Sequence, residues 1–221
     1  MAVEKVFWED PYLTELSATV TGVRGDDVTL DRTIFYAFSG GQESDAGSIG
    51  GCQVKEARKE GKEIVYTLET PHSLKTGDVV TVKIDWERRY SLMRLHFSAE
   101  IVLELMYQKY SPVEKIGAHI SSRKARVDFG WVGSISRTFP VIAENLRSIV
   151  LADLSIRSAF DDMEKEQRYW EIPGFARVSC GGTHLKRTGE VGIVNLRRNN
   201  IGKGKERIEI TLADPSAPKQ S

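Results

Sequence analysis

The sequence has few cysteines, no long apolar segment and no net charge. Its two cysteines, Cys52 and Cys180, are too few for a disulfide framework, so we expect a reducing, cytoplasmic compartment. No stretch approaches the roughly 18–20 consecutive apolar residues of a membrane span. The charged residues among positions 1–15 leave no apolar core for a signal peptide. These absences argue against a membrane protein, a secreted protein and a disulfide-stabilised scaffold, while 40% hydrophobic residues indicate a folded chain rather than a disordered one.

The neutral total conceals an asymmetry in charge. Residues 1–85 contain 9 basic and 15 acidic residues, whereas residues 86–221 contain 22 basic and 16 acidic ones. The positive half suits a polyanionic partner, and the negative half would repel phosphate. Ordinary surface solvation produces such divisions too, so charge alone leaves both interpretations open.

Residues 1–85 have the pattern of short β-strands. β-Branched and aromatic residues alternate in part with polar ones, as in the segments SATVTGVRG and DVVTVKI. Turn residues such as Gly25-Asp26 and Gly40-Gly41 separate these segments. We therefore predict five or six strands that form a small antiparallel β-barrel over residues 1–85.

The pattern changes after residue 85. Residues 86–110 contain neither Gly nor Pro and repeat apolar residues at helical spacing, which predicts a long helix. A strand over 119–132, a second helix over 136–157 and several later strands are predicted to follow. We therefore expect an α+β domain over 86–212, with two long helices against a mainly antiparallel sheet. We expect a disordered tail over 213–221.

Two polar side chains share the apolar face of the first predicted helix. His96 and Glu100 are four residues apart, and Leu92, Ala99 and Leu103 lie on the same face. A buried carboxylate that stays unpaired costs several kcal/mol. Glu100 must therefore be satisfied by a metal, an arginine, a hydrogen-bond network or a proton of its own.

A second motif is Cys180-Gly181-Gly182-Thr183-His184. Paired glycines allow a tight turn that brings the thiolate and the imidazole to one point. One cysteine and two histidines, with a carboxylate nearby, suit zinc, and a three-ligand site with an open position supports hydrolysis. Spacing alone leaves another interpretation open, in which Cys180 is a small buried hydrophobe and His96 is a core histidine.

Four segments carry a family signature: DWERRYSLMRLHFSAEIVLEL, SCGGTHLKRTGEVG, LDRTIFYAFSGGQESDAGSI and EKIGAHISSRKARVDF. They resemble the AlaX family, the free-standing relatives of the alanyl-tRNA synthetase editing domain, over nearly the whole chain. The Gly-rich segment, LDRTIFYAFSGGQESDAGSI, is similar to the corresponding segment of medium-length AlaX proteins. The resemblance implies a trans-editing hydrolase that cleaves the ester between a wrong amino acid, typically serine or glycine, and alanine tRNA. Mischarged tRNA(Ala) is the implied partner, with no membrane and no obligate protein partner indicated.

The resemblance also implies zinc as the cofactor, held by an H-x3-H and a C-x3-H motif. The matching residues are His96, Cys180 and His184, with Glu100 in the place of the second histidine. We expect Glu100 to bind the metal and to take part in catalysis, because carboxylate oxygens also ligate zinc. Alternatively, Glu100 acts as a base beside three ligands, or His119 fills the vacant position. In a further alternative the reaction is lost, which would leave a zinc-containing tRNA-binding module.

Alanine and serine differ by one hydroxyl group, so we expect hydroxyl recognition to decide the substrate. A site built to hydrogen-bond a hydroxyl rejects the analogue that lacks it. Thr33 and Thr183 are the candidate partners, Thr183 with a catalytic role because it lies in the metal turn. A local backbone hydrogen bond is the alternative for both. The Gly-rich segment is expected to influence the choice of amino acid through Gly40, Gly41, Gln42 and Asp45.

Basic clusters are candidate phosphate contacts, which position RNA without reading its sequence. They comprise Arg88, Arg89, Lys186, Arg187, Arg197, Arg198, Lys203 and Lys205. A solvated surface is the alternative for each. Three rival functions remain open, namely a tRNA-binding module, a protein with purely structural zinc and an unrelated metallohydrolase. The H-E-x-x-H pattern of thermolysin-like peptidases does not occur in the sequence.

Overall fold

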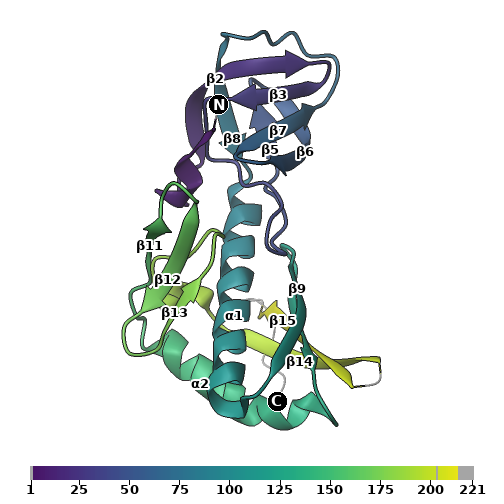
Figure 1. Ribbon diagram of the computed structural model, residues 1–221, viewed down its shortest axis with the longest axis vertical. Helices are drawn as coiled ribbons and strands as arrows, with labels where there is room; N and C mark the ends of the chain where they lie inside the picture. Colours follow the sequence, from purple (N-terminus) through teal and green to yellow (C-terminus); the bar gives the residue numbers. More distant parts are fainter. Residues whose placement is uncertain (1, 203, 214–221) are drawn as a thin grey trace. The chain divides into compact units, whose positions relative to one another are not determined.

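The computed structural model describes residues 2–202 and 204–213. The chain divides into two compact units, Met1–Tyr90 and Ser91–Ser221, and the division falls inside helix α1 (Trp86–Tyr110) (Figure 1). The tRNA contact predicted at Lys203 lies outside the described residues, as do residues 214–221 of the tail predicted to be disordered over 213–221.

The first unit is built almost entirely of strands. They are β1 (Glu4–Lys5), β2 (Glu15–Arg24), β3 (Asp27–Leu30), β4 (Arg32–Thr33), β5 (Gly47–Ile49), β6 (Cys52–Glu60), β7 (Glu63–Leu68) and β8 (Val79–Ile84), with a short 3-10 helix at Val6–Trp8. Six of them pair antiparallel in the closed order β2-β3-β7-β6-β5-β8, because β8 pairs with β2. The β1–β4 pair is parallel.

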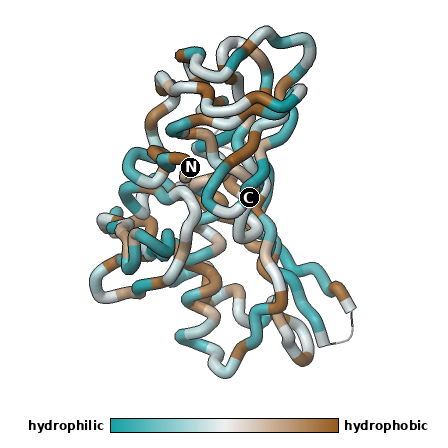
Figure 2. Tube along the Cα trace, turned by 45° about the horizontal axis from the view of Figure 1, so that its top comes forward, coloured by the Kyte–Doolittle hydropathy of each residue, from teal (hydrophilic) through white to brown (hydrophobic). Residues whose placement is uncertain are grey.

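Alternating residues of these strands form the core of the first unit. Val80, Val82 and Ile84 of β8 are buried while the residues between them are more exposed, the period expected for a strand with one covered face. Figure 2 shows this mixture of hydrophobic and hydrophilic residues along the chain. Gly25 (φ 62°) and Gly61 (φ 63°) occupy two hairpin turns, in a left-handed conformation that glycine adopts without strain.

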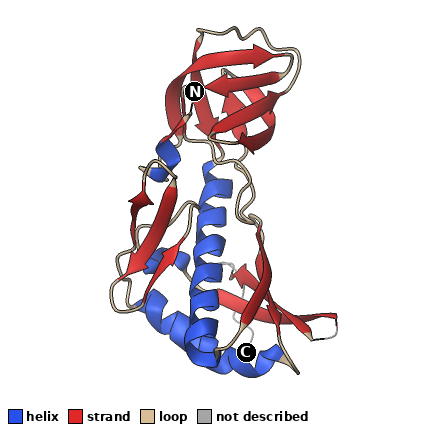
Figure 3. Cartoon of the chain, viewed as in Figure 1, coloured by secondary structure: helices blue, strands red, loops and turns tan. Residues whose placement is uncertain are grey.

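The second unit combines helices with two antiparallel sheets. Its elements after α1 are β9 (Glu114–Ile120), β10 (Ala125–Gly130), a 3-10 helix (Ile135–Thr138), α2 (Phe139–Leu151), β11 (Arg157–Asp162), β12 (Gln167–Ile172), β13 (Ala176–Ser179), a 3-10 helix (Thr188–Val191), β14 (Val194–Gly202) and β15 (Lys205–Leu212). The sheets have the orders β14-β15-β10-β9 and β11-β12-β13. The predicted α+β class, with mainly antiparallel sheets and two helices, is confirmed (Figure 3).

Helix α1 runs between the two sheets of the second unit (Figure 1). The helix predicted over 86–110 is confirmed, but its burial extends beyond the single predicted face, since Leu95, Phe97, Ile101 and Leu105 are also buried. A helix covered on several sides needs apolar residues all round. Among the described residues, no helix has the length and apolarity that crossing a membrane requires.

Two predicted elements differ from the structure. The single strand predicted over 119–132 is the end of β9 and all of β10, joined by a turn in which the Ser121 N–H and hydroxyl both donate to the Lys124 carbonyl at 2.9 Å. The helix predicted over 136–157 was too long. It ends near Leu151 because the Thr188 hydroxyl donates to Ile149 O at 2.7 Å and accepts from Leu154 N at 2.8 Å.

Candidate metal centre

Three predicted ligands converge in the second unit. His96 lies on α1, and Cys180 and His184 lie in the turn that follows β13. The Cys180 Sγ atom is 3.5 Å from His96 Nε2 and 3.3 Å from His184 Nε2. The three ligand atoms all lie within 4.8 Å of one another. Two imidazoles and one thiolate at this spacing are a donor set that suits zinc.

The second nitrogen of each histidine has a partner of its own. His96 Nδ1 is 3.4 Å from the Thr183 carbonyl oxygen, and His184 Nδ1 is 3.0 Å from Ser158 Oγ on β11. The two rings stack with centroids 5.3 Å apart and planes 26° apart. Partners of this kind fix the tautomer and the orientation of a metal-binding imidazole. They leave both Nε2 atoms facing the thiol.

The charges of the centre stabilise one another. Burial raises the pKa of the Cys180 thiol, but His96 and His184 more than offset it and hold that pKa at about 6. Burial lowers the pKa of His96, whereas the Cys180 thiolate and the Glu100 carboxylate raise it to about 10. The neighbouring imidazoles therefore favour the thiolate, which is the form that binds metals.

Glu100 lies beside this centre and is not a member of the three-residue group found among the described residues. Its Oε2 accepts a hydrogen bond from Trp170 Nε1 at 3.0 Å, and its Oε1 is 3.7 Å from His96 Nε2. Burial raises the pKa of Glu100, but His96 and Trp170 together bring it down to about 2. Glu100 is therefore an ionised acceptor next to the three clustered residues, and its role as a fourth ligand stays a prediction.

The two other candidates for the centre have different surroundings. His119 lies on β9 opposite Arg126 of β10, and it is not among the three clustered ligands of the described residues. Thr183 is buried within the turn, and its carbonyl oxygen faces His96. The structure therefore places Thr183, but not His119, at the centre.

The predicted substrate-binding residues all belong to the first unit. Gly40 (φ 59°) and Gly41 (φ 88°) form a left-handed turn closed by backbone hydrogen bonds between Ser39 and Gln42. Gln42 is buried. Thr33 is buried, and its hydroxyl accepts hydrogen bonds from Phe35 N at 3.0 Å and Tyr66 OH at 2.8 Å.

Asp45 and Arg89 form a buried ion pair within the first unit. Arg89 Nε donates to Asp45 Oδ1 at 2.8 Å, and the guanidinium also donates to the carbonyls of Ile34 and Pro11. Both side chains are fully buried. Arg89 therefore does not fit the predicted phosphate contact, because its charge is inside the protein and its donors are engaged. Arg88 is partly exposed and binds Glu43.

The remaining predicted phosphate contacts are exposed residues of the second unit. They are Lys186, Arg187, Arg197, Arg198 and Lys205. Arg187 binds Asp153, and Arg198 binds the buried carboxylate of Glu206 at 2.5 Å. A hollow of about 610 Å³ at the β14–β15 hairpin is lined by Arg198, Asn200 and Trp131 among others.

Sequence reasoning missed Arg168, Trp170 and Ser158. Arg168 and Trp170 are two apart on β12 and both are buried, so strand periodicity places them on one face. That period was the only available signal. Ser158 carries no sequence signal, because its role depends on how β11 lies beside the turn that holds His184.

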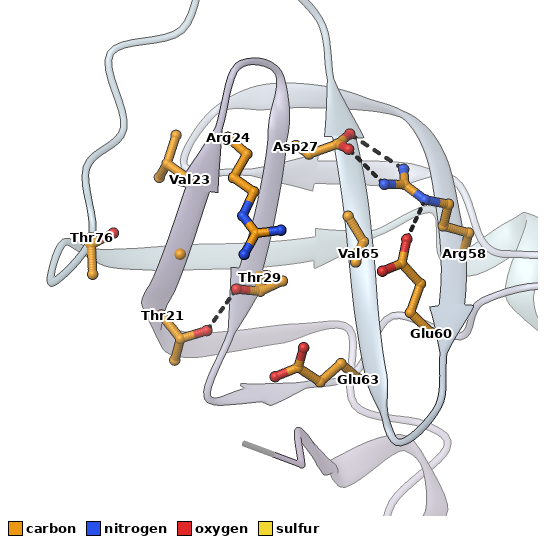
Figure 4. A pocket seen from close by; sticks show the side chains of 11 residues that line it. Thr21, Val23, Arg24, Asp27, Thr29, Arg58, Glu60, Glu63, Val65 and Thr76 are labelled. Carbon is orange, nitrogen blue, oxygen red and sulfur yellow. Dashed lines mark hydrogen bonds and ion pairs between the residues drawn. The ribbon is translucent and has the colours of Figure 1, made fainter.

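The first unit has a polar pocket of about 500 Å³ on its strands (Figure 4). Arg58 is held there by Asp27 and Glu60, and the Thr21 and Thr29 hydroxyls contact each other at 2.8 Å. None of the predicted site residues lines it. The paired charges explain why the pocket is polar without carrying a large charge of one sign.

Comparisons with known proteins agree with this architecture. Residues 5–88 match the family described as tRNA synthetases class II (A), and residues 171–209 match the threonyl and alanyl tRNA synthetase second additional domain. The chain is 32% identical to the alanyl-tRNA editing protein AlaX-M of Pyrococcus horikoshii, over 94% of this chain and 97% of that protein. It is 32% identical to AlaX-M of Saccharolobus solfataricus, over 95% of this chain and 98% of that protein. It is 31% identical to alanine–tRNA ligase of Methanococcus aeolicus, over 94% of this chain but 25% of the ligase.

The fold, the ligand cluster and these matches define a protein built from synthetase-type domains and carrying a candidate metal centre. The near-complete coverage of both chains separates it from the much longer ligases. The chain belongs to the AlaX family.

Proposed function

We propose that this protein removes wrongly attached amino acids from alanine tRNA by zinc-assisted hydrolysis of the aminoacyl ester. The observation that carries the proposal is the cluster of His96, Cys180 and His184 in a chain that aligns over 94% of its length with an alanyl-tRNA editing protein. Ser-tRNA(Ala) is the proposed main substrate and Gly-tRNA(Ala) a second one. The partner is therefore mischarged tRNA(Ala).

The residues present fit zinc. Cys180 supplies a thiolate, His96 and His184 supply Nε2 atoms, and the Nδ1 atoms are held by Thr183 and Ser158. When bound, zinc would act as a Lewis acid on the ester carbonyl. A catalytic zinc site keeps a position open beside three protein ligands, and the cluster of His96, Cys180 and His184 supplies three.

Glu100 has the position of the residue that orients the attacking water. Trp170 holds its Oε2, so Oε1 can accept a proton or a hydrogen bond from water beside His96. The water oxygen attacks the carbonyl carbon, the bond to the ribose oxygen breaks, and that oxygen leaves as a hydroxyl with a proton. The products are the free amino acid and uncharged tRNA.

The two units have different proposed tasks. Residues 86–212 form the editing domain, in which Thr183 recognises the hydroxyl of serine from inside the turn. Residues 1–85 form a small barrel domain, for which the closed order of strands is the support. Its Gly-rich segment, with Gly40, Gly41, Gln42 and Asp45, and the nearby Thr33 are proposed to influence amino-acid choice by holding local backbone in place.

Exposed basic residues of the second unit are the proposed phosphate contacts. Lys186, Arg187, Arg197, Arg198 and Lys205 are all exposed, and Arg187 and Arg198 also bind carboxylates. Phosphate contacts make RNA binding depend on salt concentration. Removal of one of these lysines should therefore weaken binding similarly for every tRNA sequence.

The test is deacylation of Ser-tRNA(Ala) by purified protein whose zinc content is measured on the same sample. Rapid loss of serine, sensitivity to a chelator and sparing of Ala-tRNA(Ala) are expected. His96→Ala and Cys180→Ala should lose both zinc and activity. Zinc-loaded protein that binds tRNA(Ala) without turnover would contradict the enzyme and would identify a tRNA-binding module.

A further inference from the structure

Arg168 of β12 contacts both ends of the turn that carries the candidate ligands. Its main-chain carbonyl accepts the Cys180 N–H at 2.8 Å, and its side-chain Nη1 donates to the Gly182 carbonyl at 3.4 Å. The side chain is buried, with only 4% of the residue exposed. One residue therefore holds the backbone on both sides of Gly181.

The guanidinium of Arg168 is fixed by its own surroundings. Arg168 lies opposite Phe160 of β11, and the guanidinium carbon is 5.1 Å from the centre of the Phe160 ring. Stacking on an aromatic face orients the plane of an arginine, which a lysine cannot reproduce. Burial lowers the pKa of Arg168 to about 10, although the nearby Cys180 thiolate partly opposes this decrease. The guanidinium therefore stays charged at neutral pH.

The contacts of Arg168 continue to His96 through the turn. Gly182 is followed by Thr183, whose carbonyl oxygen is 3.4 Å from His96 Nδ1. A shift of the Gly182 carbonyl would move this acceptor and so release the orientation of the imidazole. The anchored Cys180 N–H sits at the other end of the turn, where the thiolate leaves the chain.

We propose that Arg168 is a positioning residue of the metal centre, which clamps the Cys180–Thr183 turn so that the Cys180 thiolate and the His96 imidazole face one point. The buried guanidinium also places a positive charge near the thiolate. This inference rests on the metal site of the proposed function and does not depend on the hydrolysis.

The sheet offers a matched control. Arg177 of β13 also stacks on an aromatic ring, with its guanidinium carbon 3.8 Å from the centre of Tyr169, and it binds Asp161. It is exposed, and its side chain contacts Asp161 and Tyr169 rather than the turn. Arg177→Met therefore removes a stacked arginine from the same sheet while leaving the clamp intact.

The experiment measures zinc affinity of Arg168→Met, Arg168→Lys and Arg177→Met in the full chain, by competition with a chromophoric chelator. The absorption of the cobalt(II) form reports whether the thiolate still ligates. Removing a partner that supports a metal ligand typically weakens metal binding about 10–100-fold, which is the loss expected for Arg168→Met. Arg168→Lys keeps the charge and loses the planar contact, so an intermediate loss and an altered cobalt spectrum are expected. Arg177→Met should match the wild type.

Wild-type zinc affinity and an unchanged cobalt spectrum in folded Arg168→Met would overturn the proposal. If that variant does not fold, the same result for Arg168→Lys would overturn it. Circular dichroism and the urea midpoint establish folding for each variant. A wild-type protein that binds zinc but does not deacylate tRNA would contradict the proposed function, while the Arg168 comparison would still be decided by metal affinity.

Discussion

The indole N–H of Trp170 donates to the Glu100 carboxylate at 3.0 Å, and the other carboxylate oxygen lies 3.7 Å from His96 Nε2. Glu100 thus has one oxygen engaged by the protein and one beside the candidate ligands. A carboxylate in this position can orient a water molecule with one oxygen while the other oxygen keeps its hydrogen bond to Trp170. This arrangement makes two roles of Glu100 testable: binding the metal as a ligand, or orienting the water that attacks the ester.

Glu100→Gln should leave zinc content as in the wild type and reduce deacylation of Ser-tRNA(Ala) by about 10²–10⁴-fold. The amide still accepts from Trp170, but it cannot take a proton from water. Metal analysis and single-turnover deacylation on one preparation measure both effects. A Glu100→Gln protein that purifies without zinc would instead make Glu100 a ligand.

Ser158→Ala should weaken zinc binding by roughly tenfold or more. The mutation removes the group that lies 3.0 Å from His184 Nδ1 and holds the ring with Nε2 towards Cys180. Zinc affinity is measured by chelator competition. Ser148→Ala is the matched control, because the Ser148 hydroxyl donates to Glu144 O on α2, and its zinc affinity should be unchanged. Equal affinities for the two variants would contradict the role of Ser158.

Thr183→Val should lower kcat/KM for Ser-tRNA(Ala) by about tenfold or more while changing Gly-tRNA(Ala) hydrolysis little. Valine keeps the shape of threonine and removes the hydroxyl that we propose recognises serine. Thr183→Ser keeps a hydroxyl and should retain the preference for serine. Parallel losses on both substrates would show that Thr183 supports the turn and does not select the amino acid.

Asp45→Ala should destabilise the protein by about 3–5 kcal/mol, because it leaves the Arg89 guanidinium buried without its carboxylate. Urea unfolding followed by circular dichroism measures the loss. Glu15→Ala is the matched control: the Lys83–Glu15 pair has a similar contact of 2.9 Å but is more than half exposed. Its removal should cost no more than about 1 kcal/mol. Similar losses of stability for both variants would show that burial does not decide how much the Asp45–Arg89 pair contributes to the free energy of unfolding.

Asp27 should make stability depend on pH. The Arg58 guanidinium and the Thr67 hydroxyl, acting against burial, hold the pKa of Asp27 below its ordinary value. Because the folded pKa is lowered, the stabilisation is present above about pH 3.9 and is lost as the pH falls below it. The stability difference between wild type and Asp27→Asn, measured by urea midpoints, should therefore shrink between pH 6 and pH 3.

The matched control for Asp27 is Glu60→Gln. Glu60 also binds Arg58, at 2.9 Å, but its side chain is 57% exposed, so solvent screens the interaction. Glu60→Gln should therefore change the stability only slightly at every pH. A stability difference for Asp27→Asn that stays constant from pH 6 to pH 3 would contradict the assignment.

Much of the fold follows from local patterns in the sequence. The absence of Gly and Pro from 86–110 and the helical spacing predict α1 with the bounds that the structure has. Alternation and turn residues predict the strand-rich first unit. The second helix was predicted too long because its end is decided by Thr188, which is 37 residues further along the chain than Leu151. A contact between residues so far apart in the sequence cannot be predicted from a local pattern.

Local spacing pairs the candidate ligands within each motif, because His96 and Glu100 share a helix face and Cys180 and His184 share a turn. The family resemblance joined the two motifs into one ligand set. The partners of the site were not predictable in the same way. Arg168 and Trp170 lie on β12 and reach the turn and α1 only after the sheet has formed.

The sequence by itself determined the class of fold and the position of α1, because these depend on residue type and on short spacing, and its resemblance to AlaX proteins indicated the three residues of the candidate metal cluster. Tertiary structure decided that Glu100 binds Trp170 beside the cluster, that Arg89 is buried against Asp45, and that Arg168 holds the ligand turn. The physical reason is burial. A charged side chain removed from water must find a partner, and only the packing of distant segments decides which partner is within reach.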